Sequence, residues 1–333
     1  MNQTSLYPLR FEPIFQYRLW GGQQFAGLLT APQLAEGPVG EAWLLSDRDE
    51  QSSVIADGLF KGQTLRQLLA ERPDQMWGIG GVQFKRFPLL LKFLDVRGSL
   101  SVQVHPSDRQ TEYLPAGESG KAEAWVVLEA GSEARVYAGL VPYATKDTVR
   151  EALNHGAVAG QIASFAPKVG DGVFIPAGAV HSLRNTVVFE VQENSDVTFR
   201  LFDWDHVDAK TRQPRPLQVE QAMACIEFTQ RAIGPVVPSV ESSEPVLHEK
   251  LVACEHFSLW RTRSMSAFVV GASGRLRVLV CIDGSGQIHH GGVDYACCKG
   301  DVLLLPAEVG ECSFEPDGSV TVLEVGVPAR IDP

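Results

Sequence analysis

Two histidines, a glutamate and a glutamine occupy positions from which short strands could point them into a common interior. Gln103 and His105 are two residues apart in an alternating segment, so their side chains share one face of a strand. Glu123 lies in a second β-rich segment, and His181 follows a Pro and a Gly that favour a tight turn able to aim it inward. Two imidazoles, a carboxylate and an amide oxygen form a mixed shell suited to one divalent metal, with room for water or substrate. A lone histidine on a strand is more often a core or surface residue, so the prediction rests on all four together.

The segments that carry these residues read as strands. Short β-rich stretches, most of them bounded by Gly, Pro, Asp or Ser, follow one another from about residue 85 to residue 205. Helical patterns interrupt them at residues 65–71, where Thr64 could act as the N-cap, and at residues 145–154 and 216–229. This pattern predicts a mainly β catalytic domain with short helical insertions.

The last third of the chain reads as a second, smaller all-β domain. Residues 236–246 are rich in Pro and Ser and predict a linker between a first domain, residues 1–235, and a second, residues 247–333. The stretch 300–307 (GDVLLLPA) echoes 170–177 (GDGVFIPA), which hints at two related barrels. In the second barrel Glu311 stands at the position that echoes His181, and the adjacent His289 and His290 would face opposite ways on a strand. We therefore expect this domain to be structural and to bind no catalytic metal.

Composition excludes several classes of function. The 333-residue chain has a formal net charge of −11, which argues against nucleic-acid or anionic-membrane binding because both need a positive field. It has no run of about 18 apolar residues, and residues 1–21 lack the basic and apolar regions of a secretory signal. All six cysteines lie in the second half and none forms a CxxC pair, which favours reduced thiols. We expect a cytoplasmic protein and a monomer.

One motif connects the predicted metal ligands to a known fold. Residues 170–185 match the pattern G-x5-P-x-G-x2-H-x3-N, the second motif of the cupin superfamily, at every fixed position. The chain does not match the first cupin motif, HxH followed by Glu. Gln103 replaces the first histidine, and Glu123 lies further downstream than the motif expects. The chain thus resembles a cupin-type β-barrel or jelly roll, with the second domain as a degenerate cupin-like barrel.

Several segments in order make the resemblance more specific. The chain resembles the type I mannose-6-phosphate isomerases in their short bacterial form, and the resemblance covers about residues 20–205. The segments that carry it are Trp20-Gly21-Gly22, Gly40-Glu41-Ala42-Trp43, PLLLKFLD (88–95), LSVQVHPSD (100–108), GKAEAW (120–125), GDGVFIPAGAVHSL (170–183) and ENSDVTFRLFDW (193–204). The resemblance implies metal ligands at Gln103, His105, Glu123 and His181. It implies substrate-site residues at Lys92, Ser101, Lys121, Glu190 and Arg200.

The activity implied is the interconversion of mannose 6-phosphate and fructose 6-phosphate through an enediolate. Zn²⁺ is the expected metal, acting as a Lewis acid on the C1 and C2 oxygens. Glu190 is the first candidate for the general base, with Lys121 and a water on the metal as alternatives. Lys92 and Arg200 would hold the phosphate or stabilise developing charge, because a buried cation needs an anionic partner.

Alternatives remain at this point. Arg200 could instead pair with Asp196, Asp203 or Asp205, and we interpret Asp203-Trp204-Asp205-His206 as a solvated turn rather than a second metal site. Two other functions are compatible with a cupin: a dioxygenase that uses Fe²⁺, and a sugar-binding protein without catalytic activity. The change to an amide at position 103 and the inward cations argue against the dioxygenase.

Overall fold

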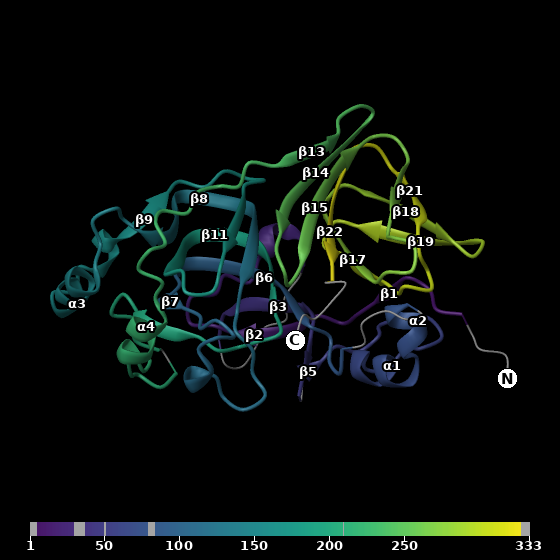
Figure 1. Ribbon diagram of the computed structural model, residues 1–333. Helices are drawn as coiled ribbons and strands as arrows, with labels where there is room; N and C mark the ends of the chain where they lie inside the picture. The colour runs from purple at the N-terminus through teal and green to yellow at the C-terminus, as the bar shows by residue number, and fades with distance from the viewer. Residues whose placement is uncertain (1–4, 30–36, 50, 79–83, 209, 328–333) are drawn as a thin grey trace.

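Two β-bodies lie side by side in the computed structural model, which describes residues 5–29, 37–49, 51–78, 84–208 and 210–327 (Figure 1). Residues 1–4 and 328–333, the two ends of the predicted domains, lie outside this description. The mainly β fold expected from the sequence is observed in the described residues, with one sheet curled around an interior and only short helices.

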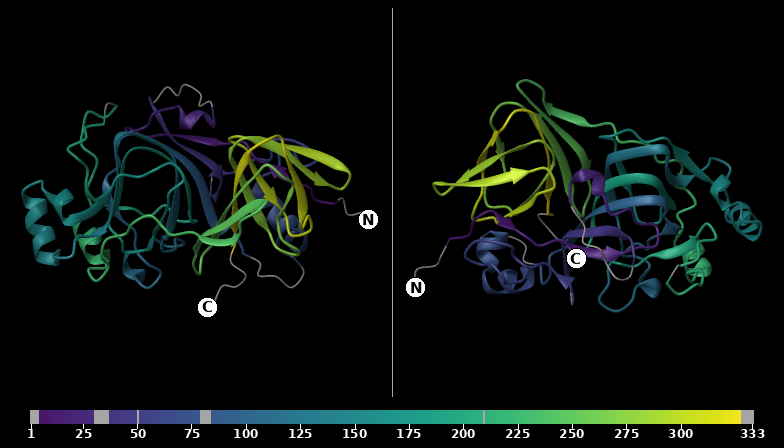
Figure 2. Two further views of the ribbon diagram at one scale, coloured as in Figure 1. Left: turned by 90° about the horizontal axis from the view of Figure 1, so that it is seen from above. Right: turned by 180° about the vertical axis from the view of Figure 1, so that it is seen from behind.

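The first body is a nine-stranded sheet that curls around an interior (Figure 2, left). Its main path runs in the order β10-β8-β11-β6-β3-β2, while β7 pairs with β11 and β12, and β9 pairs with β8. The strands are β2 (Ile14–Tyr17), β3 (Val39–Leu45), β6 (Leu89–Ser99), β7 (Val102–Val104), β8 (Glu123–Leu140), β9 (Ile162–Phe165), β10 (Gly172–Ile175), β11 (His181–Glu193) and β12 (Phe199–Phe202). A short hairpin, β4 (Asp47–Arg48) and β5 (Gln51–Ser52), lies outside this sheet.

The second body packs a seven-stranded sheet with a four-stranded one. The larger has the order β1-β20-β17-β22-β15-β14-β13, and the smaller β16-β21-β18-β19. The strands of the larger are β1 (Leu9–Arg10), β13 (Ser239–Ser242), β14 (Val246–Ala253), β15 (Ser258–Ser264), β17 (Arg277–Asp283), β20 (Val302–Leu305) and β22 (Val320–Gly326). Those of the smaller are β16 (Phe268–Val270), β18 (Ser285–His290), β19 (Val293–Cys298) and β21 (Cys312–Pro316).

The chain crosses between the two bodies near its start. Strand β1 pairs with β20, with Leu9 opposite Leu304, so the N-terminal segment completes the sheet of the second body. Strand β13 lies within the stretch expected to be a linker and pairs with β14. One buried apolar cluster contains side chains of both bodies, among them Phe93, Val126 and Phe257. The two bodies therefore share a core.

The helices are short and lie at the edges of the β-bodies. They are α1 (Leu65–Glu71), α2 (Pro73–Trp77), α3 (Lys146–Asn154) and α4 (Val219–Cys225), with 3-10 turns η1 (Phe25–Gly27), η2 (Thr111–Tyr113) and η3 (Val158–Gln161). Thr64 caps α1 as the sequence predicts, because its side chain accepts the backbone N–H of Gln67. The helix predicted over residues 216–229 is shorter in the structure, where α4 covers only Val219–Cys225. Beyond α4 the backbone N–H of Glu227 donates to Gly178 O at 2.9 Å, a tertiary bond that replaces the helical one.

Two further observations concern the chain as a whole. Among the described residues, no helix is long and apolar enough to cross a membrane. All six cysteines are free thiols, in agreement with the sequence expectation.

Candidate active site

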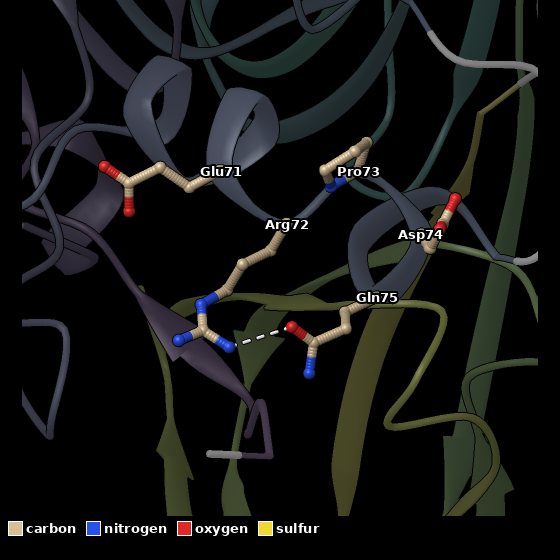
Figure 3. A pocket seen from close by; sticks show the side chains of 5 residues that line it. All are labelled: Glu71, Arg72, Pro73, Asp74 and Gln75. Atoms are coloured by element: carbon tan, nitrogen blue, oxygen red, sulfur yellow. Dashed lines mark hydrogen bonds between the residues drawn. The ribbon is translucent and has the colours of Figure 1, made fainter. Parts of the chain in front are cut away.

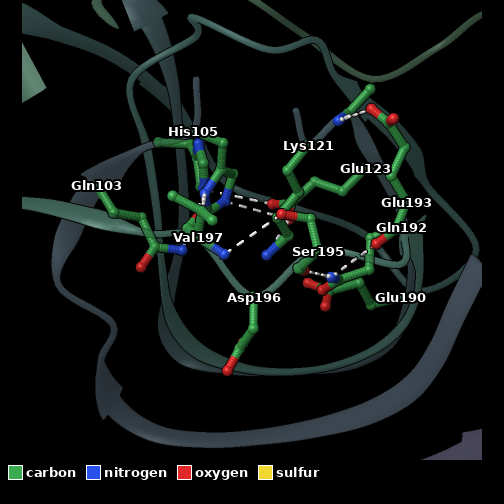
Figure 4. Close-up of polar contacts among 12 residues, drawn as sticks. Gln103, His105, Lys121, Glu123, Glu190, Gln192, Glu193, Ser195, Asp196 and Val197 are labelled. Atoms are coloured by element: carbon green, nitrogen blue, oxygen red, sulfur yellow. Dashed lines mark hydrogen bonds and ion pairs between the residues drawn. The ribbon is translucent and has the colours of Figure 1, made fainter. Parts of the chain in front are cut away.

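The two histidines and the glutamate predicted as metal ligands converge in the interior of the first body. Figure 4 shows His105 and Glu123 among the surrounding polar residues. His105 follows β7, Glu123 opens β8 and His181 opens β11, so three strands direct them to one point. Nε2 of His105 lies 3.3 Å from Glu123 Oε2, and Nε2 of His181 lies 3.2 Å from Glu123 Oε1. Each side chain is at most 1% exposed.

The backbone determines which ring nitrogen of each histidine faces Glu123. Nδ1 of His105 lies 2.8 Å from Val197 O, and Nδ1 of His181 lies 2.9 Å from Ala179 O. A ring that donates from Nδ1 leaves the lone pair of Nε2 directed at the carboxylate. Burial lowers the pKa of both histidines, that of His105 to about 3, so both rings are neutral, the form that binds a metal.

Glu123 stays ionised although it is buried. Burial alone would raise its pKa, but the neighbouring positive charge, that of Lys121 foremost, outweighs burial and holds the pKa well below the ordinary value. Nζ of Lys121 lies 3.0 Å from Glu123 Oε2.

Within the part of the chain that the structure describes, three buried ligand atoms of this site form no hydrogen bond: Nε2 of His105 and both carboxylate oxygens of Glu123. Buried polar atoms without partners are costly, and one divalent cation would satisfy all three. The donor set therefore fits the expected metal.

Gln103, the fourth predicted ligand, lies beside this group in a different orientation. Its amide nitrogen lies 3.1 Å from His181 Nε2, and its oxygen accepts the hydroxyl of Ser101 at 3.2 Å. The oxygen and nitrogen of an amide are similar in size and shape, so a half-turn of the group would place the oxygen beside His181, where it could bind a metal held by this site.

A second charged cluster lies next to the first, on β6 and β11. Nζ of Lys92 lies 3.2 Å from Glu190 Oε1 and donates to Gln192 Oε1 at 2.7 Å. The indole N–H of Trp125 donates to Glu190 Oε2 at 2.9 Å. Burial raises the pKa of Glu190, and Lys92 offsets only part of that effect. A carboxylate in this environment is a candidate proton acceptor.

An open pocket of about 430 Å³ leads to both clusters. Its wall contains all of the predicted substrate-site residues: Lys92, Ser101, Lys121, Glu190 and Arg200. Gln103 also lines it, so the metal group lies at one side of a cavity large enough for a small ligand.

Four charged residues of this pocket received no site role from the sequence: Arg18, Glu41, Asp208 and Arg215. Arg18 donates twice to Glu41, at 2.8 and 3.0 Å, and Trp43 Nε1 donates to Glu41 at 2.8 Å. The alternation in Gly40-Glu41-Ala42-Trp43 was a usable signal, because it places Glu41 and Trp43 on one face of a strand. Arg215 lies in a loop without such a pattern.

The predicted solvated turn at residues 203–206 is only partly correct. Residues 204 and 205 do form a turn, but Asp203 is buried. Its two oxygens accept from Arg215 at 2.6 and 2.8 Å, which provides the compensation that a buried carboxylate needs. Arg200 does not pair with it. In the described part of the chain Arg200 forms no ion pair, and its Nε is buried without an acceptor.

Two other features lie outside this pocket. A hollow of about 370 Å³ is lined by Glu71, Arg72, Pro73, Asp74 and Gln75, where Arg72 donates to Gln75 at 2.8 Å (Figure 3). It contains no histidine or cysteine and lies on the turn between α1 and α2. The other is a group of potential ligands, Asp108, Glu193 and His256, whose donor atoms lie within 4.8 Å of one another.

Comparisons with known proteins agree with this geometry. A family model described as "Phosphomannose isomerase type I, catalytic domain" matches residues 9–136. Two curated proteins of Bacillus subtilis (strain 168) are similar along nearly their whole length. "Probable mannose-6-phosphate isomerase GmuF" is 32% identical over 93% of this chain and 96% of its own. "Mannose-6-phosphate isomerase ManA" is 31% identical over 92% and 96%. A crystal structure of the mannose 6-phosphate isomerase from Bacillus subtilis superimposes with a TM-score of 0.86 at 28% identity, covering 96% of this chain and 99% of that one.

Removal of one buried ligand should empty the metal site. We expect the His181→Ala protein, purified and folded, to contain little metal, because the remaining ligands cannot complete the shell. The loss of metal affinity should exceed the roughly 10- to 100-fold typical of outer-shell changes, whereas Gln103→Ala should be milder because an amide is neutral. Elemental analysis of metal per chain measures this. His206→Ala, outside the triad, is the control, and full occupancy in His181→Ala would contradict the assignment.

Proposed function

The chain belongs to the type I mannose-6-phosphate isomerase family, and from that premise we propose how its site interconverts mannose 6-phosphate and fructose 6-phosphate. The observation that carries the proposal is the buried His105–Glu123–His181 group with its unpartnered ligand atoms, opening onto a pocket lined by cations. Family membership favours this activity over the dioxygenase and the non-catalytic binding protein. Turnover of mannose 6-phosphate by the metal-loaded protein tests it, and absence of turnover would contradict it.

The metal that the site would hold is proposed to be Zn²⁺, with His105, Glu123 and His181 as ligands and Gln103 as a fourth. Zn²⁺ has no redox chemistry, accepts nitrogen and oxygen ligands, and would supply a Lewis acid to the oxygens at C1 and C2. An isomerisation moves no net electrons, so a redox-silent metal suits it.

Proton transfer between C1 and C2 is assigned to Glu190. Its raised pKa brings the carboxylate closer to the pH at which the enzyme operates, where a general base is most effective. Trp125 and Lys92 hold the two oxygens in place. Glu190 takes the proton from C2 of the aldose, which leaves an enediolate, and returns it to C1. The hydroxyl proton on O2 passes to O1 in the same conversion, so that C1 becomes an alcohol and C2 a ketone. Lys121, bound to Glu123, is the alternative acid–base group.

The phosphate end of the substrate is assigned to Arg200. The other cations of the pocket already have anionic partners, since Arg18 pairs with Glu41, Lys92 with Glu190, Lys121 with Glu123 and Arg215 with Asp203. Within the described residues, Arg200 is the pocket cation without an ion pair, and its Nε has no acceptor. Burial, followed by the neighbouring Arg215, lowers its pKa, so an arriving anion would relieve an existing electrostatic cost.

The setting of the enzyme completes the proposal. Six free thiols suit a reducing compartment, which supports a cytoplasmic location. The monomeric state expected from the sequence stays a prediction.

Arg200→Ala should reduce turnover of the phosphorylated sugar selectively. A hydrogen bond to a charged group contributes about 1.5–3 kcal/mol, so kcat/KM for mannose 6-phosphate should fall roughly 10- to 100-fold, while that for free mannose changes little. Steady-state kinetics on both sugars measures the difference. Arg184→Ala, which removes a surface pair with Glu133, is the control. Equal losses on both sugars would instead assign Arg200 to the enediolate.

Trp125→Phe should move the acid limb of the pH profile. The indole N–H stabilises the ionised form of Glu190, so its loss raises the pKa of that carboxyl further. A base is lost as pH falls through its pKa, and the acid limb of kcat/KM should therefore shift to higher pH. Trp43→Phe is the matched control, because Trp43 makes the same bond to Glu41, which is not assigned as a base. An unchanged acid limb in Trp125→Phe would remove Glu190 from that role.

A further inference from the structure

A histidine of the second body reaches the edge of the active site. Nδ1 of His256, in the turn between β14 and β15, lies 3.1 Å from Oε2 of Glu193, the last residue of β11. The side chain of Glu193 is 9% exposed and that of His256 is 24% exposed. This contact joins residues from the two bodies at the end of a strand that begins with His181.

The turn that carries His256 is anchored in the shared core. The next residue, Phe257, is 1% exposed, and its ring packs edge-to-face against Phe174 of β10 with the centroids 6.4 Å apart. The backbone next to His256 is therefore held in place, so that its side chain contacts Glu193 from a fixed position.

Glu193 in turn forms hydrogen bonds with the segment that precedes β8. Its Oε1 accepts the backbone N–H of Ala122 at 2.7 Å, and its own N–H donates to Ala122 O at 3.1 Å. Asp108 accepts the N–H of Gly120 at 2.6 Å. The two carboxylates thus hold the backbone on either side of Lys121, which lies two residues before Glu123.

We propose that His256 is a positioning residue, through which the second body fixes the placement of Lys121 and Glu123 by way of Glu193 and Ala122. The inference rests on the proposed function of that site and goes beyond it, because it gives the second body a part in catalysis. Partners outside the ligand shell commonly change metal affinity or activity by about 10- to 100-fold, since small displacements of reacting groups are costly.

Either protonation state of Glu193 supports the contact. Burial raises the pKa of this carboxyl to about 8, so near neutral pH it is largely protonated. A protonated Glu193 donates to Nδ1, and an ionised one accepts from it. The amide of asparagine offers both a donor and an acceptor near the position of Nδ1, which makes His256→Asn the conservative replacement.

The test compares three variants of the metal-loaded enzyme with the wild type. His256→Ala should lower kcat for mannose 6-phosphate about tenfold with KM changed less than about twofold, because the phosphate end of the pocket is untouched. Metal affinity, measured by competition with a chelator, should also weaken. His256→Asn should restore most of both. His248→Ala is the matched control: it is 32% exposed and binds Thr262 and Glu241 within the second body.

A double variant checks the route of the effect. If His256 acts through Glu193, His256→Ala should add little to Glu193→Ala. The proposal is overturned if His256→Ala keeps the wild-type kcat and metal affinity, if it loses no more than His248→Ala, or if its loss adds fully to that of Glu193→Ala. Failure of the wild type to turn over mannose 6-phosphate would overturn the proposed function instead, and the chelator competition would still test His256.

Discussion

An ionised carboxylate buried in a β-barrel, that of Glu123, sets the arrangement around it. Removing a charge from water costs several kcal/mol unless partners compensate for it, and this side chain is 1% exposed. Lys121 provides compensation with its ammonium group 3.0 Å from the carboxylate, while the neutral rings of His105 and His181 lie 3.3 and 3.2 Å from its two oxygens. The register of the strands that place these residues is therefore constrained. His181 pairs with Gln103 across β11 and β7, and a slip of one residue would turn the ligands to the opposite face.

The same requirement extends across the pocket and explains how an acidic protein can receive an anionic substrate. Each buried acid has a cation beside it: Glu190 has Lys92, Glu41 has Arg18 and Asp203 has Arg215. In each pair the positive and negative charges balance. The pairs therefore hold the side chains of the cavity in place without adding net charge to it. Among the described residues, Arg200 is the pocket cation without an ion pair, and its proposed role is to supply the local charge that an anionic substrate needs in a chain that carries −11 overall.

The two β-bodies behave as one structural unit because they share a buried apolar cluster. Strand β1 comes from the start of the chain yet belongs to the sheet of the second body, and Phe257 of the second body packs on Phe174 of the first. A body joined in this way can support a distant site through a few contacts. The link from His256 to Glu193 and on to Ala122 is one such contact, and it ends one residue before Glu123.

The sequence by itself determined the elements and the donor set. Period-two alternation placed Gln103 and His105 on one face, the Pro and Gly before His181 predicted a turn, and Thr64 marked the start of α1, because all three signals are local in the backbone. Only the tertiary structure decided which groups compensate one another. Arg215 binds Asp203 from a loop that has no periodic pattern. Glu227, beyond the end of α4, donates its backbone N–H to Gly178. His256 contacts Glu193, which lies 63 positions earlier in the chain (256 minus 193). Such pairings depend on three-dimensional distance and on burial, and a one-dimensional pattern carries neither.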